Sequence, residues 1–561
     1  MYKVCQFIIF QYNDSAHTLA YHFKYFSNLI RPADDIYLSD KNADFVIQTI
    51  FSLLHRYMHP VCINNMLVIV AFFLAFAACY LLFRKLNIHR SLQVIFSLLY
   101  SASIYFIYRV ESVTPALYMT FIIPATFFLY MRATKPLVTG LFVATSFMIS
   151  NYYGFFALIV SLLLNAFNIM LAGVEYKRAV RSFIINSICL VLPILTLLLA
   201  VYGKQFLVNT PLFGNYEDVQ NAEIVVKKQV VFRPVEDWYN LSFRPWYFFI
   251  PPKESLFFGK LSEDVHKKIE ITKYYLADDY TEQEMAGSYL GWHFIFGAAL
   301  VVWLLLMRKF KHKEFGLFNS VYANRVTIYR SLFLILCILL ISGPPSFTVN
   351  GVEIYTPTYI LYYLVPVFRT LVRWSVLIYL CILVVNSFLV QDLYSLAGKT
   401  WQKTLFIVLF IAINFVIFTV KIPVININKP PSEIAFVKEK FPTSVSYAVY
   451  PKGDFYSIFW ILSHEDILMN PVDLVNFETG FETNVFSRGL ISDEGLKEFL
   501  NNRPKYLIYY SNKISDDSLE SIKEINPGIS SREDIYRFFI AHLGVPLYSQ
   551  GGVIIFGTEV E

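Results

Sequence analysis

Charged residues are scarce in this chain. Asp, Glu, Lys and Arg make up 16% of its 561 residues, whereas a soluble domain carries about 25%. Hydrophobic residues account for 56% and aromatic residues for 18%, and the mean hydropathy is +0.49. The composition therefore predicts a polytopic membrane protein. The net charge of +5 does not indicate nucleic-acid binding, because membrane proteins sort their basic residues by side.

Cysteine is also rare, and its spacing excludes the common metal and redox motifs. There is no C-x-x-C pair and no Cys/His cluster of the kind that binds zinc. The sequence likewise has no P-loop, no G-x-G-x-x-G after a strand, no zincin helix and no serine nucleophile elbow. Nucleotide hydrolysis, Rossmann redox chemistry and zinc hydrolysis are thus disfavoured. The six cysteines are Cys5, Cys62, Cys79, Cys189, Cys337 and Cys381.

Long runs of apolar residues make up much of the sequence. A run of about 17–25 apolar residues can cross a bilayer as a helix. The sequence predicts about ten such helices, and the pair at 136–173 needs a very tight turn at "ISNYYG". The predicted spans cover residues 63–83, 91–108, 114–131, 136–150, 152–173, 182–202, 291–307, 331–345, 371–391 and 404–422.

Basic residues in the short connections predict the orientation of the helices. Alternate connections are rich in Lys and Arg, whereas the short connections on the other side hold Arg109. Because basic loops stay in the cytoplasm, the basic connections are predicted to be cytoplasmic. Their basic residues include Arg84, Lys85, Arg90, Arg132, Lys135, Lys177, Arg178, Arg181, Arg325, Arg330, Lys399 and Lys403.

With this orientation, three polar segments are predicted to lie outside the cytoplasm. The chain is therefore predicted to be an integral protein of the cell membrane. The predicted divisions are an N-terminal segment at 1–60, helical bundles at 61–202 and 291–422, a large loop at 203–290 and a soluble domain at 423–561. The last segment alternates strand-like runs such as "SVSYAVY", "KYLIYYS" and "GGVIIFGTE" with a helical run, "SDEGLKEFLNN", which predicts a small α/β domain. The apolar run in "MYKVCQFIIF" is short, so either the chain starts outside the membrane or an anchor helix precedes it.

Two arginines open a late apolar segment. Arg369 and Arg373 stand four residues apart in "VFRTLVRWSVLIYL", which on a helix places them on one face. Arginine at the bilayer centre costs about 2.5–3.5 kcal/mol on insertion scales. One interpretation is snorkelling to the headgroups. The other is a phosphate or pyrophosphate site, because the guanidinium fork matches phosphate oxygens. Pro357 and Pro366 predict a short helix that dips in and turns just before this pair.

Acidic residues near the N-terminus are further candidates. Asp14 in "YNDSAHTLAYHF" could act as a general base, or it could simply cap a helix. Asp34 and Asp35 are adjacent carboxylates, which could bind Mg²⁺ or Mn²⁺ or could belong to a solvated acidic loop.

The large loop carries aromatic and basic residues close to the membrane. Its segments "FRPWYFFIPPKESLFFGK" and "EMAGSYLGWHFIFG" contain Arg244, Trp246, Lys253 and Tyr289. Such residues form interfacial belts in membrane proteins. They could also line a groove for a sugar or a lipid.

The order of these segments resembles the GT-C superfamily of membrane glycosyltransferases and, within it, the bacterial YfhO-like membrane proteins. The similar stretches, in chain order, are "NDSAHTLAYHFKYFSNLI", "YFIYRVESVTPALYMTFIIPATFFLYMR" with "SNYYGFFAL", the two large-loop segments, and "LVPVFRTLVRWSVLIYL". The chain departs from the family where a histidine often follows the external arginine, since it reads "RVESVTP" there.

The resemblance implies an all-α GT-C-like polytopic bundle with an extracytoplasmic α/β domain. It also implies transfer of a sugar from a polyprenyl-phosphate donor to an extracytoplasmic glycan, lipid or protein of the cell envelope. Asp14 would be the catalytic base, and Arg369 with Arg373 would hold the lipid phosphate. The expected partners are membrane lipids and the polyprenyl-linked sugar, with no nucleic acid. The alternative is a non-catalytic lipid or polysaccharide transporter or assembly scaffold.

Overall fold

The computed structural model describes the chain in separate stretches. They are residues 7–9, 45–54, 57–58, 60–111, 114–132, 134–172, 175–208, 235–268, 287–311, 318–350, 352–365, 370–422, 424–426, 432–440, 446–450, 467–468, 491–493, 496–497, 506–514, 519–520, 522–523 and 526–558.

The chain forms two compact units. One consists of Asp35–Leu54 with Ile63–Pro423 and contains the long helices; the other combines Met1–Asp34, His55–Cys62 and Val424–Glu561 and contains the larger sheet. The predicted boundaries inside the helical part, at 203 and 290, remain predictions.

Seven helical segments in the described residues are long and apolar enough to cross a membrane, and three shorter apolar helices accompany them. Each of the ten predicted spans coincides with one of these ten segments, so the protein is a polytopic membrane protein with a helical bundle. The number of crossings remains a prediction. The long segments are Cys62–Lys85, Arg90–Glu111, Asn151–Leu171, Tyr176–Leu197, Arg325–Ser342, Leu371–Leu396 and Thr400–Phe418, and the shorter ones are Pro115–Met131, Pro136–Ile149 and Trp292–Met307.

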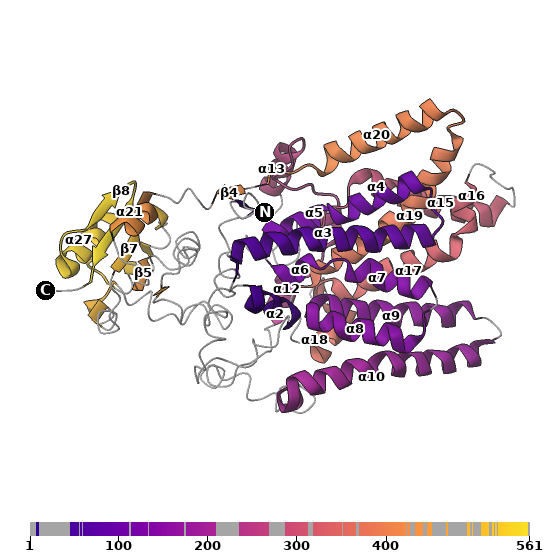
Figure 1. Ribbon diagram of the computed structural model, residues 1–561, viewed down its shortest axis with the longest axis horizontal. Helices are drawn as coiled ribbons and strands as arrows, with labels where there is room; N and C mark the ends of the chain where they lie inside the picture. The colour runs from indigo at the N-terminus through magenta and orange to yellow at the C-terminus, as the bar shows by residue number, and fades with distance from the viewer. Residues whose placement is uncertain are drawn as a thin grey trace. The chain divides into compact units, whose positions relative to one another are not determined.

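The bundle contains the following helices, labelled in Figure 1 where there is room. They are α2 (Phe45–Leu54), α3 (Pro60–Lys85), α4 (Arg90–Ser101), α5 (Ile104–Glu111), α6 (Pro115–Tyr118), α7 (Ile122–Met131), α8 (Pro136–Ile149), α9 (Asn151–Leu171), α10 (Tyr176–Val208), α15 (Trp292–Lys311), α16 (Asn319–Ala323), α17 (Arg325–Ser342), α19 (Ser375–Leu396) and α20 (Thr400–Phe418).

Helix α19 forms the centre of the bundle. Its span is 89% buried, whereas the spans of α10 and α20 are only 11% buried. A helix that is apolar on all sides belongs in the interior, and the sequence "SVLIYLCILVVNSFLV" has that character. Helices α4, α15, α16 and α17 pack around it. The exposed faces of α10 and α20 are therefore the natural lipid-facing surfaces.

The tight turn predicted at "ISNYYG" is confirmed. Helix α8 ends at Ile149 and helix α9 begins at Asn151, so Ser150 alone joins them in an extended conformation. Gly154 makes this close return possible, because a Cβ at this residue would lie 2.6 Å from the Cα of Phe147 in α8. The first turn of α9 is thus held firmly against α8.

The basic connections lie together at one end of the bundle. The backbone N–H of His89 donates to Gln391 in α19, and the Lys403 ammonium lies 5.4 Å from the Tyr394 ring centre. Arg330 in α17 donates to Asn168 near the end of α9. These contacts join connections that are distant in sequence, and we call this region the basic end. Its location in the cytoplasm remains a prediction.

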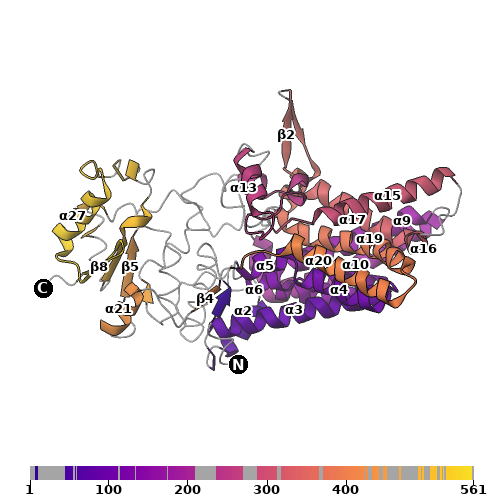
Figure 2. The ribbon, with the colours of Figure 1, turned by 90° about the horizontal axis from the view of Figure 1, so that it is seen from above.

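Short elements form the opposite end. The Leu241 carbonyl accepts a hydrogen bond from Val372, and the Ser342 carbonyl accepts one from Phe243. A two-stranded hairpin projects from this end in Figure 2. The elements are α12 (Val235–Asn240), η5 (Pro245–Phe248), α13 (Gly259–Lys268), β2 (Ser346–Val349), β3 (Val352–Tyr355), α18 (Pro357–Leu364) and the 3-10 turn η7 (Leu371–Trp374).

The second unit contains a five-stranded sheet with the order β6-β5-β7-β9-β8. Strand β5 is parallel to both β6 and β7, and β9 is antiparallel to both β7 and β8. Helix α27 packs Phe539 on a core that includes Tyr509 and Phe556. The predicted α/β fold of this segment is confirmed. The elements are β5 (Ser446–Tyr450), β6 (Ile467–Leu468), β7 (Tyr506–Tyr510), η9 (Ser511–Lys513), α27 (Arg532–Leu543), β8 (Tyr548–Gln550) and β9 (Val553–Gly557).

This unit also includes a small antiparallel pair. Strand β1 (Phe7–Ile9) pairs with β4 (Val424–Asn426), so part of the apolar N-terminal run is a strand. Helix α21 (Ser432–Lys440) follows β4. Cys62 is disulfide-bonded, while Cys79, Cys189, Cys337 and Cys381 are free thiols.

Candidate functional site

The structure corrects the predicted geometry around Arg373. The sequence suggested one helix carrying Arg369 and Arg373 on the same face. Instead, Thr370 has φ −99° and ψ 76°, the 3-10 turn η7 follows, and the α-helix starts only at Ser375. Arg373 therefore lies in a 3-10 turn and not in an α-helix, and Arg369 lies outside the described residues. The short helix predicted before the pair is confirmed as α18.

Turn η7 places Arg373 against the start of helix α9. The Arg373 guanidinium carbon lies 4.4 Å from the centre of the Tyr152 ring, a cation–π distance. The next residue, Trp374, is fully buried and stacks on Phe156 with ring centres 3.8 Å apart. Since Tyr152 and Phe156 lie one turn apart on α9, two successive side chains of η7 are fixed on one helix face. Arg373 is half-buried and its position is defined by packing.

The start of α9 adds to the positive potential beside Arg373. The first N–H groups of an α-helix have no acceptor within the helix, and the aligned peptide dipoles make this end positive. Ser150 precedes the helix but makes no side-chain capping bond, and its buried hydroxyl has no hydrogen-bond partner among the described residues. A guanidinium and an uncapped helix start together favour an anion.

A second arginine lies close to the same turn. Arg109 is 1% exposed, and its guanidinium carbon lies 5.4 Å from the centre of the Tyr105 ring. The Tyr105 hydroxyl is 3.2 Å from the hydroxyl of Tyr153, which donates to the carbonyl of Leu117. Tyrosines thus connect Arg109 to the first turn of α9.

Two carboxylates accompany Arg109. Glu111 is 3% exposed and lies within electrostatic range of both Arg109 and Glu254. Glu254 accepts a hydrogen bond from the Tyr108 hydroxyl. The sequence analysis missed both carboxylates, although an acidic residue within "YRVES" in an apolar region is a signal that could have found Glu111.

Four of the predicted site residues cannot be placed. Asp14, Asp34, Asp35 and Arg369 lie outside the described residues. No group of three or more His, Cys, Asp or Glu side chains that could hold a metal ion occurs in the described part of the chain.

Arg244 has a different environment from the one predicted for a substrate groove. It is 1% exposed, and its two terminal nitrogens donate to the carbonyls of Ser242 and Tyr239, each at 2.9 Å. Burial lowers the pKa of Arg244 from its usual value. These bonds hold the chain that leaves α12 and that also accepts the hydrogen bond from Val372.

The other predicted groove residues differ in how far they are exposed. Trp246 is 37% exposed, Lys253 is half-buried, and Tyr289 is 3% exposed. The Tyr289 ring packs against Trp292 and Phe418, with ring centres 6.0 and 6.1 Å apart. A role for these residues in substrate binding remains a prediction.

Comparison with known proteins adds one structural similarity. No family model matches the sequence, and no curated protein matches it. The fold is similar to the crystal structure of the Archaeoglobus fulgidus oligosaccharyltransferase in its apo form, at 10% sequence identity and a TM-score of 0.44. The alignment covers 94% of this chain and 68% of that chain. A similarity of this size supports no conclusion about function.

Proposed function

We propose that the protein is a membrane glycosyltransferase that transfers a sugar from a polyprenyl-phosphate donor to an acceptor outside the cytoplasm. The observation that carries the proposal is the position of Arg373, half-buried against Tyr152 at the uncapped start of α9. Both features favour a phosphate group, and the site lies at the end of the bundle away from the basic connections. The choice of a polyprenyl-phosphate sugar as donor rests on the resemblance of the order of the sequence segments to that in GT-C glycosyltransferases.

The proposed chemistry is a displacement at the anomeric carbon. The acceptor hydroxyl oxygen bonds to that carbon, the bond from the carbon to the phosphate oxygen breaks, and the hydroxyl proton passes to the Asp14 carboxylate. The polyprenyl phosphate leaves with the bonding electrons. Arg373, with Arg369, stabilises the negative charge that develops on the leaving phosphate, an effect that is strong where water is excluded.

The test is sugar transfer by the full-length protein in proteoliposomes, assayed with a panel of polyprenyl-monophosphate sugars and cell-envelope acceptors. The double variant Arg369→Gln/Arg373→Gln should lose transfer by about 100-fold or more, as when one preorganised donor is removed from an active site. Arg325→Gln changes an exposed arginine at the basic end and should transfer sugar normally. Full activity in the double variant would exclude the proposed role of the arginines.

The same assay separates a transferase from a transporter or scaffold. Asp14→Asn should abolish transfer while polyprenyl-phosphate binding is kept, because the carboxylate acts on the proton and not on the phosphate. If no panel member is transferred by the wild-type protein, while lipid binding still depends on Arg373, the transporter or scaffold alternative is favoured.

A further inference from the structure

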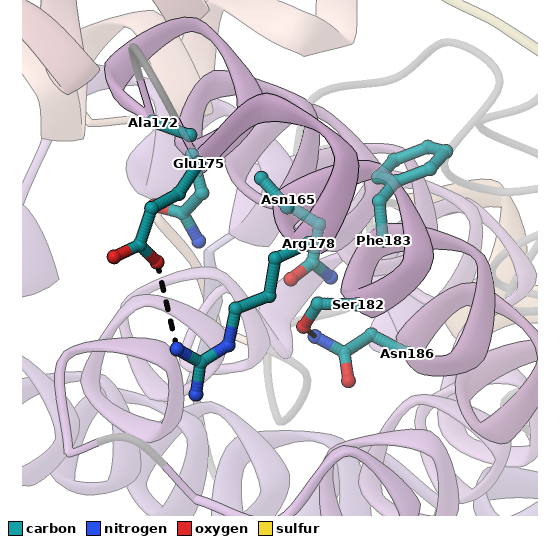
Figure 3. A pocket seen from close by; sticks show the side chains of 9 residues that line it. Asn165, Ala172, Glu175, Arg178, Ser182, Phe183 and Asn186 are labelled. Carbon is teal, nitrogen blue, oxygen red and sulfur yellow. Dashed lines mark hydrogen bonds and ion pairs between the residues drawn. The ribbon is translucent and has the colours of Figure 1, made fainter.

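A polar recess lies between helices α9 and α10 at the basic end of the bundle, opposite the end that holds Arg373. Its volume is about 490 Å³. Figure 3 shows the side chains that line it. The polar ones are Asn165, Asn168, Glu175, Arg178, Ser182 and Asn186.

The polar residues on α10 form a single row. Arg178, Ser182 and Asn186 follow one another at intervals of four residues, which places them along one side of the helix. Asn186 stands ten residues beyond the helix start at Tyr176, or about 15 Å along the axis at 1.5 Å per residue. The recess thus extends from the helix end into the zone of apolar residues.

Helix α9 contributes a matching row from the other side. Asn165 and Asn168 are one turn apart near the end of α9, and both line the recess. The Asn168 side-chain oxygen accepts a hydrogen bond of 3.3 Å from Arg330 in α17. Asn165 makes no side-chain hydrogen bond within the described part of the chain. Polar side chains at this depth are costly unless they face protein or a hydrated cavity, so the facing rows indicate a site for a polar group.

The charges at the mouth favour an anionic group. Arg178 and Glu175 form an ion pair of 3.6 Å, but their side chains are 85% and 71% exposed. Such exposed pairs contribute about 0–1 kcal/mol, so Arg178 can exchange this partner for a phosphate at little cost. Lys177 and Arg181 are exposed on the same turns and leave an excess of positive charge over Glu175.

The surface next to the recess is apolar. Ile185, one turn after Ser182 on α10, is 49% exposed, and Ile188 and Leu192 continue the same stripe at 58% and 56% exposed. This face has the character of a lipid-facing surface and begins at the depth of the recess. An occupant with a phosphate in the recess could therefore extend hydrocarbon chains along α10. An amphiphile fits both the positively charged recess and the apolar surface of α10, whereas inorganic phosphate fits the recess alone.

We infer that this recess binds the phosphodiester headgroup of an anionic phospholipid from the leaflet at the basic end. Arg178 contacts the phosphate, and the amides of Asn165 and Asn186 bind the polar headgroup deeper in the recess. The acyl chains lie along the exposed face of α10. The site is separate from the proposed polyprenyl-phosphate site, since η7 and the start of α9 lie at the opposite end of the same helix.

The experiment measures lipid binding to the full-length protein in detergent by native mass spectrometry. Phosphatidylglycerol should bind to the wild-type protein in preference to phosphatidylcholine. Arg178→Gln and Asn186→Leu should each weaken phosphatidylglycerol binding by about tenfold, the effect expected for losing about 1.4 kcal/mol of a charge-assisted or buried hydrogen bond. Arg181→Gln is the matched control, because it removes one positive charge from the same helix without touching the recess.

Three results would overturn the inference. The first is equal binding of phosphatidylcholine and phosphatidylglycerol to the wild-type protein. The second is equal weakening by Arg181→Gln and Arg178→Gln, which would indicate only a general attraction between charges. The third is displacement of the lipid by inorganic phosphate at low millimolar concentration, which would assign the recess to a free anion. Circular dichroism of each variant confirms that the helices are retained, and Asn186→Gln, which keeps the amide, should bind lipid better than Asn186→Leu.

Discussion

Replacing Gly154 with alanine should displace the start of α9 from α8. The added Cβ would lie 2.6 Å from the Cα and 2.7 Å from the backbone nitrogen of Phe147. Carbon atoms in contact are normally about 3.5–4.0 Å apart, so the helices must separate by about 1 Å. Because Ser150 alone joins α8 to α9, the connection cannot absorb that movement.

The cost follows from two opposing effects. Overpacking of this kind costs about 1–3 kcal/mol, and alanine recovers about 0.8–1 kcal/mol of helix propensity relative to glycine. We therefore expect a net loss of up to about 2 kcal/mol. Tyr152 and Tyr153 lie in the turn that moves, so the contact between Tyr152 and Arg373 should loosen as well.

The assay is thermal unfolding of the purified protein in detergent together with binding of a polyprenyl monophosphate. Gly154→Ala should lower the melting temperature by a few degrees and weaken lipid binding. Gly398→Ala is the control, because a Cβ at Gly398 would have nothing within 4 Å. Equal melting temperatures and equal lipid affinities for Gly154→Ala and the wild-type protein would refute the argued packing of α8 on α9.

Two further predictions concern the large loop and the sheet unit. Arg244→Gln should destabilise the protein by about 1–3 kcal/mol for each carbonyl left without its donor. Arg244→Lys should not restore stability, since one ammonium cannot replace the guanidinium fork. A melting temperature equal to that of the wild-type protein in either variant would contradict this. Hydrogen bonds from Ser530 and Ser531 lower the pKa of Asp534 to about 2, well below the usual value for an aspartate. The folded-state pKa is lowered, so this carboxylate stabilises the fold above about pH 4 and the contribution is lost as the pH falls toward 2. Asp534→Asn should therefore have a lower melting temperature than the wild-type protein at pH 6, and the two melting temperatures should converge near pH 2. Unfolding is followed by near-ultraviolet circular dichroism. A constant difference between the two melting temperatures across that pH range would count against the assignment.

The apolar helices could be predicted from the sequence because a membrane span depends on the composition of one continuous segment. The predicted runs at 63–83, 152–173 and 404–422 each coincide with a helix. The strands "SVSYAVY", "KYLIYYS" and "GGVIIFGTE" were also predictable, since each combines β-branched or aromatic residues with flanking turn signals. The single-residue turn at Ser150 could be predicted from the spacing of two apolar runs.

The site was less predictable because it depends on contacts between distant segments. The sequence indicated Arg373, but periodicity assigned it to an α-helix, whereas the chain forms a 3-10 turn fixed by the hydrogen bond from Val372 to Leu241. Similarly, "FRPW" gave no sign that Arg244 would turn inward to bind carbonyls of its own loop. The proximity of Arg109 to the start of α9 arises from pairing of two tyrosines 48 residues apart, which no local pattern reveals.

The central claim is that a lipid phosphate binds where η7 meets the start of α9. The most direct measurement is the affinity of a polyprenyl monophosphate for the full-length protein carrying Arg373→Gln. We expect the affinity to fall by about tenfold or more, in line with the loss of a charge-assisted hydrogen bond, with partial recovery in Arg373→Lys. An unchanged affinity in Arg373→Gln, or an equal fall in Arg325→Gln, would contradict it.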